Sequence, residues 1–180
     1  MDEAISQRDK EFGDLNARMR DGGIGLVYFG GYHTEASLFV RQARAQGLKA
    51  TMMVNSAMLT REYWDLAGTA AEGTLMTFGP DPRKLPSAAE VTARFEAEGH
   101  EAEARTLYSY AAVQVFAGAA RKAGSTDLER LERELHADTF QTVVGPITFD
   151  AKGDNARYEF RMYRWHDGRY EDICCGLGLP

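Results

Sequence analysis

The amino-acid sequence predicts an α/β protein with a parallel, Rossmann-like sheet, and three observations support this class. Short apolar runs alternate with helical patterns through residues 12–78, and glycines follow several of these segments. Alternation of this kind is typical of parallel strands joined by covering helices. The chain has 180 residues, 44% of them hydrophobic and 27% charged, which is the composition of a folded globular protein.

The first elements are expected to follow one another as helix, strand and helix. Phe12, Leu15 and Met19 have helical spacing, and a pair of glycines follows them. Residues 24–29, with the sequence IGLVYF, form a continuous apolar run, which predicts a strand covered on both faces. Thr34 is the expected N-cap of the next helix, in which apolar residues recur every three or four positions.

Two further strands are expected before the pattern becomes helical. They cover residues 50–54 and 73–78, with a short helix between them. After the segment PDPRKLPS, Ser87 and Glu90 have the spacing of a capping box. The long helix predicted at 103–123 is apolar nearly all round, so we expect it to be well buried.

The C-terminal part of the sequence predicts a β-hairpin. Its strands are expected at 143–149 and 157–165, with the turn DAKGDN between them. Alternation with a period of two places Tyr158, Phe160 and Met162 on one face of the second strand.

Charge and hydropathy exclude several kinds of partner. The net charge is −6 and both signs are interspersed, which argues against nucleic-acid binding. No apolar run approaches the ~20 residues of a membrane helix, so we expect no direct membrane insertion. The start of the sequence, MDEAISQRDK, has no apolar signal core, which predicts a cytoplasmic location for the chain as written. Cys174 and Cys175 are adjacent, which favours free thiols over a metal or redox role.

Catalytic signatures are missing from the sequence. It contains no GxSxG, GxxxxGK[ST] or HExxH motif, and its glycine-rich GGIG precedes a strand, whereas a dinucleotide fingerprint follows one. The histidines are scattered, at His33, His100, His136 and His166. We therefore expect neither an enzyme nor a bound cofactor or metal.

The polar group at residues 32–35, Tyr-His-Thr-Glu, is the candidate binding site that the residues themselves indicate. It follows the strand predicted at 24–29, and ligands of open α/β sheets bind beyond the carboxyl ends of strands. A tyrosine hydroxyl and the free N–H groups of a helix suit a carboxylate. Glycine, tyrosine and a threonine cap also occur at such positions for purely local reasons.

The stretch VYFGGYHTEASLFVRQARAQGLKA resembles the leucine/isoleucine/valine-binding proteins of bacterial ABC transporters, in the type I periplasmic-binding-protein class. The similarity continues, in the family's order, through AGTAAEGTL, YSYAAVQVFAGAARKAG, TFQTVVGPITFDAKGD and YRWHDGRYE, and spans most of residues 10–171. The resemblance implies a periplasmic protein that binds an amino acid between two lobes, works with a membrane ABC permease and is not an enzyme.

The resemblance also implies individual ligand contacts. Tyr32 resembles the tyrosine that helps to hold the ligand from the second lobe, and Ser56 stands where the family has an acidic residue for the ligand's ammonium group. A charge-assisted hydrogen bond contributes about 1.5–3 kcal/mol and a neutral one about 1 kcal/mol, so we expect weaker binding or a changed ligand. Asn55 is a weaker candidate. Tyr108, with Tyr110, would lie in the cleft wall or serve in helix packing.

The resemblance covers only the C-terminal half of the family. It implies a partial second-lobe α/β segment at 1–100, a helical segment at 101–140 that packs on the first lobe in the family, a β-hairpin at 141–171 that returns to the second lobe, and a tail at 172–180. The lobe is then incomplete and has an open apolar edge. We expect an intertwined homodimer to complete it.

Two functions therefore remain open at this point. The first is a truncated solute-binding component, related to branched-chain amino-acid receptors, that binds a small amino acid or has lost this binding. The second is a homo-oligomeric structural or interaction protein that keeps the fold without binding a ligand. An enzyme or a cytosolic amide sensor on a related fold has less support, because no nucleophile–base pair is present.

Overall fold

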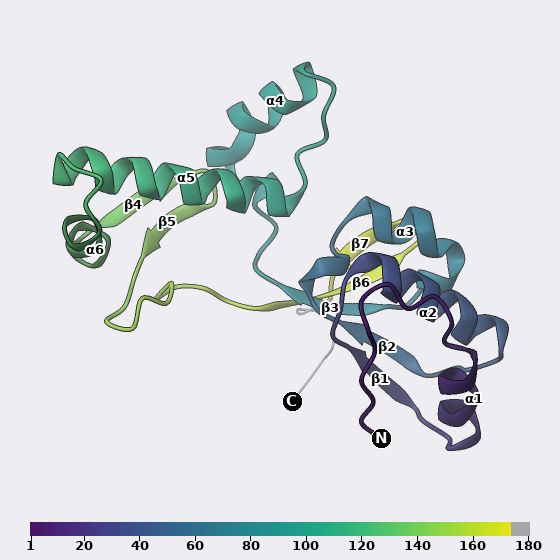
Figure 1. Ribbon diagram of the computed structural model, residues 1–180. Helices are drawn as coiled ribbons and strands as arrows, with labels where there is room; N and C mark the ends of the chain where they lie inside the picture. The colour runs from purple at the N-terminus through teal and green to yellow at the C-terminus, as the bar shows by residue number, and fades with distance from the viewer. Residues whose placement is uncertain (174–180) are drawn as a thin grey trace. The chain divides into compact units, whose positions relative to one another are not determined.

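The chain divides into two compact units in the computed structural model, which describes residues 1–173. Unit 1 combines residues 1–78 with the C-terminal part that begins at Phe160, and unit 2 consists of residues 79–159 (Figure 1). Unit 2 is therefore an insertion between two segments of unit 1. The expectation of free thiols at Cys174 and Cys175 lies outside the described residues.

Unit 1 is a five-stranded sheet with helices. Its elements are α1 (Gly13–Asp21), β1 (Leu26–Phe29), α2 (His33–Ala45), β2 (Thr51–Val54), η1 (Ser56–Met58), α3 (Arg61–Ala67), η2 (Gly68–Ala71), β3 (Leu75–Phe78), β6 (Arg161–His166) and β7 (Arg169–Asp172). The strand order is β1-β2-β3-β6-β7. The first three strands are parallel, and β6 and β7 join them in antiparallel pairs. The predicted α/β fold with a parallel core is confirmed.

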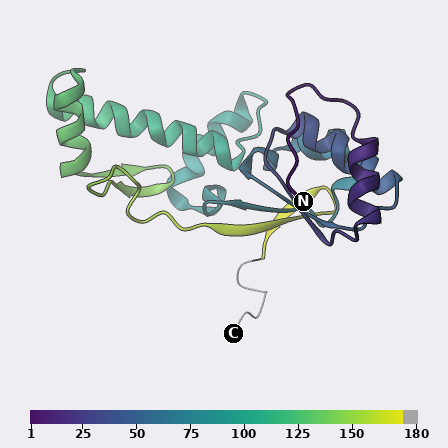
Figure 2. The same ribbon diagram turned by 60° about the horizontal axis from the view of Figure 1, so that its bottom comes forward.

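The described helices of unit 1 cover one face of this sheet. Val27 and Phe29 of β1 are buried, whereas Leu26 and Tyr28 are 54% and 60% exposed. The helices α2 and α3 lie over the buried face, where Phe39 of α2 packs against Phe29 with the ring centroids 5.4 Å apart (Figures 1 and 2). The prediction that residues 24–29 are covered on both faces is therefore wrong, because no described helix of unit 1 lies over the second face.

The buried face of β6 is the one opposite to Met162. Tyr163 and Trp165 are buried, while Phe160 precedes the strand and is 72% exposed. The indole N–H of Trp165 donates to the carbonyl of Met58 at 3.0 Å, and this bond fixes which face turns inward. A strand alternates its side chains, so one buried anchor decides the orientation of all the others.

Unit 2 is mainly helical. Its elements are η3 (Pro82–Lys84), η4 (Pro86–Ala88), α4 (Ala89–Ala97), α5 (Ala104–Ala123), α6 (Leu128–Ala137), β4 (Thr139–Thr142) and β5 (Gly145–Thr148). Its apolar residues form two clusters along α5, one with α4 and the other with α6 and β4. Residues 79–100, which the resemblance groups with the first segment, belong to this unit.

The strands expected at 143–149 and 157–165 do not pair along their length, and around the DAKGDN turn the structure has one isolated antiparallel bridge, between Phe149 and Asn155. Instead, β4 pairs with β5 in unit 2, and β6 pairs with β7 in unit 1. The turn between β6 and β7 contains Asp167 and Gly168, both with positive φ, as a two-residue hairpin turn requires. The segment DAKGDN is a turn, but it lies between strands of different sheets.

The long helix α5 is buried on one side only. Leu107, Ala111 and Val115 are buried, but Val113 and Phe116 are 67% and 53% exposed. The expectation of an all-round buried helix is thus wrong for the described chain. Nor does Ser87 form the expected capping box, because its hydroxyl donates to the carbonyl of Val143 at 3.0 Å.

An exposed hydrogen-bonded pair holds the β6–β7 turn. Nδ1 of His166 lies 2.6 Å from Oε1 of Glu72, and the N–H of Asp167 donates to Oε2 at 3.0 Å. The bond with Glu72 raises the pKa of His166 above 6.5, and the bonds from His166 and Asp167 lower the pKa of Glu72 below 4.5.

We predict that Glu72→Gln lowers the pKa of His166 towards 6.5, measured by NMR titration of the imidazole. In the wild type, the contribution of His166 to stability is present below pH 6.5 and is lost as the pH rises through the raised pKa. The contribution of Glu72 is present above pH 4.5 and is lost as the pH falls through the lowered pKa. An unchanged imidazole pKa in Glu72→Gln would contradict the pairing.

Candidate functional site

The loops that follow β1 and β2 are joined by one side chain. The amide nitrogen of Asn55 donates to the carbonyl of Gly31 at 3.1 Å, and its amide oxygen accepts from the N–H of Ala57 at 2.8 Å. Because β1 and β2 are parallel, their carboxyl ends meet at the same edge of the sheet. Asn55 therefore positions these loops, and both ends of its amide group already have partners.

Tyr32 begins the helix at this edge and points into solvent. It is the N-cap residue of α2, its carbonyl accepts from the N–H of Ala36, and its side chain is 66% exposed. Glycine is needed at position 31, just before Tyr32, because a Cβ there would lie 2.7 Å from the ring of Phe29. Thr34, the expected cap, lies inside the helix, so that prediction is wrong by two residues.

A carboxylate reaches the same edge from α3. Oε2 of Glu62 lies 3.1 Å from Nε2 of His33, the residue next to Tyr32. Asp65, which is also on α3 and close to Ser56 in sequence, pairs with Arg61 at 3.0 Å. The sequence patterns did not reveal the His33–Glu62 pair, because the two residues lie on different helices and only the packing of α2 against α3 brings them together.

Of the other predicted site residues, Ser56 lies in unit 1 and Tyr108 lies in unit 2. Ser56 is half-buried and follows Asn55 at the start of η1, so it lies at the edge that carries Tyr32. Tyr108 lies in unit 2, where its hydroxyl donates to the carbonyl of Pro80 at 2.9 Å. Burial, together with the neighbouring Tyr158 and Asp81, raises the pKa of Tyr108 to about 12.

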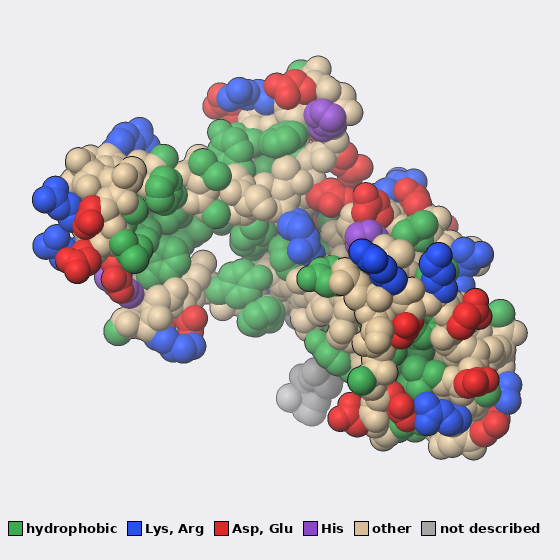
Figure 3. Space-filling view, in the orientation of Figure 1, with side chains coloured by type: hydrophobic (Ala, Val, Ile, Leu, Met, Phe, Trp, Pro, Cys, Tyr) green, Lys and Arg blue, Asp and Glu red, His purple; other side chains and the backbone are tan. Residues whose placement is uncertain are grey.

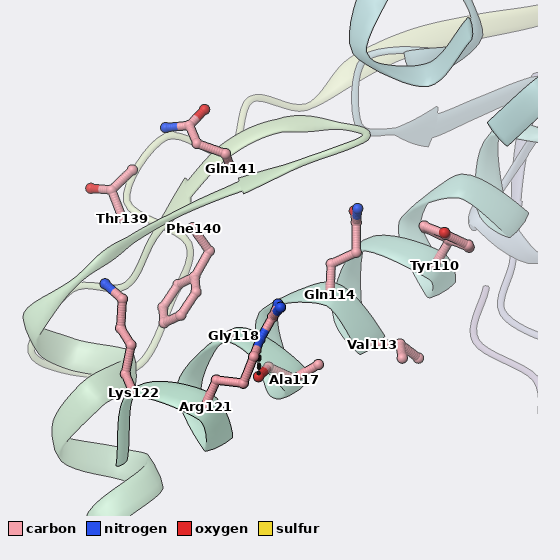
Figure 4. Close-up of a pocket in the computed structure, with 10 residues that line it drawn as sticks. All are labelled: Tyr110, Val113, Gln114, Ala117, Gly118, Arg121, Lys122, Thr139, Phe140 and Gln141. Carbon is pink, nitrogen blue, oxygen red and sulfur yellow. Dashed lines mark hydrogen bonds between the residues drawn. The ribbon is translucent and has the colours of Figure 1, made fainter. Parts of the chain in front are cut away.

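Unit 2 has a groove of its own, between α5 and β4. Its volume is about 450 Å³, and it is lined by polar and apolar side chains that include Gln114, Arg121 and Gln141 (Figure 4). The ammonium group of Lys122 is paired with Asp138 at 2.5 Å. Of the residues singled out in the sequence, this groove contains only Tyr110.

Two structural features are absent from the described chain. Residues 1–173 contain no group of three or more His, Cys, Asp or Glu side chains that could hold a metal ion. None of the helices in this part of the chain combines the length and hydropathy that crossing a membrane requires.

An α/β unit of this topology, with polar groups at the carboxyl ends of its parallel strands, is the architecture of a ligand-binding lobe. Residues 2–169 match the family model described as periplasmic binding protein, and the chain belongs to this family. It is a family of binding proteins and not of enzymes, as the resemblance in the sequence implied.

Individual relatives show which members of the family the chain is similar to. The chain is 43% identical over 175 residues to the Leu/Ile/Val-binding protein homolog 1 of Brucella suis, and 40% identical over 174 residues to an amino acid binding protein of Pseudomonas aeruginosa. The matches cover 95% of this chain but only 47% and 46% of those relatives. The chain thus spans about half the length of the curated relatives it matches.

Solved structures agree with the fold. The leucine-binding protein LivK of Thermotoga maritima superposes with a TM-score of 0.81 at 25% identity, over 92% of this chain and 48% of that protein. LivJ of Streptococcus pneumoniae, solved in complex with isoleucine, gives a TM-score of 0.78 at 20% identity. The observed architecture is therefore half of the fold that these receptors have.

We predict that Asn55→Ala destabilises the chain and that Tyr32→Ala does not. Asn55→Ala removes two half-buried hydrogen bonds, each worth about 0.5–1.5 kcal/mol, and so costs roughly 1–3 kcal/mol. Tyr32→Ala removes an exposed side chain that caps nothing, so its effect stays within about 0.5 kcal/mol. Urea unfolding followed by circular dichroism measures both, and equal losses would contradict the positioning role of Asn55.

Proposed function

We propose that this chain is a truncated solute-binding component, related to branched-chain amino-acid receptors of ABC transporters, and that it binds a small amino acid through Tyr32 and its neighbours. The observation that carries the proposal is the exposed Tyr32 at the carboxyl edge of β1, in a chain that belongs to the periplasmic binding proteins. The relatives named for leucine, isoleucine and valine support this substrate class.

The residues at this edge have the chemistry that an amino acid needs. The start of α2 offers N–H groups that suit a carboxylate, and the tyrosine hydroxyl can donate to the same group. Ser56 supplies a hydroxyl where a carboxylate is expected from the resemblance. Glu62, which pairs with His33, the residue after Tyr32, is the carboxylate at this edge that we assign to the ligand's ammonium group.

Binding at this half-site is expected to be weak. One lobe leaves the ligand open to solvent, whereas small-molecule sites usually bury most of their ligand. The roles of Asn55 and Tyr108 are indirect in this proposal, because Asn55 holds the loops and the hydroxyl of Tyr108 donates to Pro80. We include delivery of the ligand to a membrane ABC permease, in the periplasm, only because the chain belongs to this family.

Titration calorimetry with leucine, isoleucine and valine tests the proposal. We expect heat from at least one of them, and about tenfold weaker binding in Tyr32→Ala, equivalent to the ~1.4 kcal/mol of about one hydrogen bond. Glu62→Gln should also weaken binding. Tyr28→Ala is the control, since Tyr28 is a similarly exposed tyrosine but lies within β1, before the loop that carries Tyr32. Flat titrations with a folded wild type would refute amino-acid binding.

The second candidate function is a homo-oligomeric interaction protein, and the open side of α5 favours it. Residues 106–120 of this helix carry no charge, and Ala112, Val113 and Phe116 are exposed. Figure 3 shows hydrophobic side chains exposed over unit 2. Contiguous apolar surface on a soluble chain indicates an interaction site. A second copy that packs on α5 would form the homodimer expected from the sequence.

Size-exclusion chromatography with light scattering tests this candidate. We expect the mass of two chains at micromolar concentration, and the mass of one chain in Phe116→Glu, because a charge in the middle of the interface cannot be buried without a partner. Leu128→Glu is the control, since Leu128 is 75% exposed but lies on α6. A wild type with the mass of one chain would exclude the homodimer.

A further inference from the structure

One imidazole lies against the carboxylate of the proposed binding edge. Nε2 of His33 is 3.1 Å from Oε2 of Glu62, and the side chains of these residues are 31% and 69% exposed. The carboxylate is therefore open to a ligand from solvent, while the imidazole beside it is mostly covered. A cationic group of a ligand that binds Glu62 must share this carboxylate with His33.

Contacts between α2 and α3 fix the two residues next to each other. The buried hydroxyl of Ser37 lies 2.6 Å from the carbonyl of His33 and 3.3 Å from that of Tyr63, the residue after Glu62. Tyr63 is itself buried, and its hydroxyl bonds to Thr74 at 3.0 Å. Because both backbones are held in this way, the His33–Glu62 pair forms without the entropic cost of ordering a loop.

Other charged side chains on α2 and around it have partners of their own. On α2, Glu35 accepts from the N–H of Arg8 at 3.0 Å, and Arg41 and Arg44 donate to backbone carbonyls. No charged side chain is found on η1, η2, β2 or β3, which are all within the described chain. The ion pairs on α3 and α1 are Arg61–Asp65, Arg18–Glu3 and Arg20–Asp21, and Asp14 lies near Arg18. The charge that faces the imidazole of His33 is thus that of Glu62.

A histidine in contact with a carboxylate changes the strength of this contact with its proton. Histidine gains its positive charge at physiological pH, between about pH 5 and 8, and glutamate ordinarily stays ionised above about pH 4.3. Within this range the carboxylate keeps its charge while the imidazole changes from a neutral group to a cation. A charge-assisted hydrogen bond is about twice as strong as a neutral one, so the imidazolium binds the carboxylate more firmly.

We propose that His33 controls the access of an amino acid's ammonium group to Glu62. The imidazolium of His33 neutralises the carboxylate and competes with the ammonium group, whereas the neutral imidazole leaves the carboxylate to the ligand. The proton on His33 and the bound amino acid therefore oppose each other, and amino-acid binding is linked to pH. The inference rests on the proposed binding of an amino acid at Tyr32 and Glu62, and it makes His33 a positioning residue.

The proposal also states which ligands respond to pH. Leucine has both a carboxylate and an ammonium group, so its binding should weaken when His33 is protonated. Isocaproate has the same branched chain and carboxylate but no ammonium group, so Glu62 has no cation to bind. Protonation of His33 removes negative charge from the edge, and the binding of this anion should not weaken.

Titration calorimetry with leucine and isocaproate, at about pH 5.5 and about pH 8, tests the proposal. We expect leucine to bind roughly five- to tenfold more weakly at the lower pH, the difference between a charge-assisted and a neutral hydrogen bond. The weakening should follow the protonation of the His33 imidazole, observed by NMR. Circular dichroism at both pH values checks that the protein stays folded.

Substitutions at two histidines separate the proposed role from a general effect of pH. His33→Gln should abolish the pH dependence, and His33→Lys, which keeps a positive charge at both pH values, should bind leucine weakly at both. His166→Gln is the matched control and should behave as the wild type. His166 makes a similar pair with Glu72 at 2.6 Å but lies at the other edge of the sheet, beside the start of β3.

The outcomes distinguish this proposal from the proposed function. Leucine binding that does not depend on pH, or that still depends on it in His33→Gln, would overturn the role of His33 and leave amino-acid binding intact. Equal weakening of isocaproate in the wild type would also overturn it, because the effect would not involve the ammonium group. An absence of leucine binding at both pH values would refute the proposed function, and this inference with it.

Discussion

The antiparallel pairing of β3 with β6 is the constraint on which the rest of the structure depends. The chain leaves unit 1 at the end of β3, forms all of unit 2, and returns as the strand next to β3. Bringing the two ends of unit 2 together has an entropic cost, which contacts around β6 must offset. Trp165 provides them: it is buried, it stacks on Trp64 with the ring centroids 5.7 Å apart, and its indole N–H is satisfied by Met58.

The parallel core could be predicted from sequence because its signals are local. Each strand from 24 to 78 is a short apolar run, and each helix has its own periodicity and a nearby glycine. The hairpins could not be placed in the same way. The pair Asp167-Gly168 is a strong hairpin signal, but DAKGDN is a competing one, and only the pairing of β6 with β3 decides between them. The orientation of β6 likewise depends on Met58, which is distant in sequence.

The candidate site, like the fold, could be predicted where its signals are local in sequence. The rule that ligands bind at the carboxyl ends of parallel strands places Tyr32 and Asn55 together, and the structure joins their loops through Gly31. The rule does not distinguish a residue that contacts ligand from one that holds a loop, and the two bonds of Asn55 favour the second role. Glu62 and Asp65 are both acidic residues near Ser56 in sequence, but the place of Glu62 beside His33 could not be predicted, because it depends on how α2 and α3 pack.

The open edge and the candidate site share one strand. The loop that carries Tyr32 begins where β1 ends, and within residues 1–173 β1 has a neighbouring strand on only one side. A strand held by one ladder is less constrained than one held by two, since each ladder fixes its backbone through separate hydrogen bonds. The loop at Gly31 and Tyr32 therefore follows a strand with one free edge, and Asn55 is the side chain that ties this loop to the one after β2.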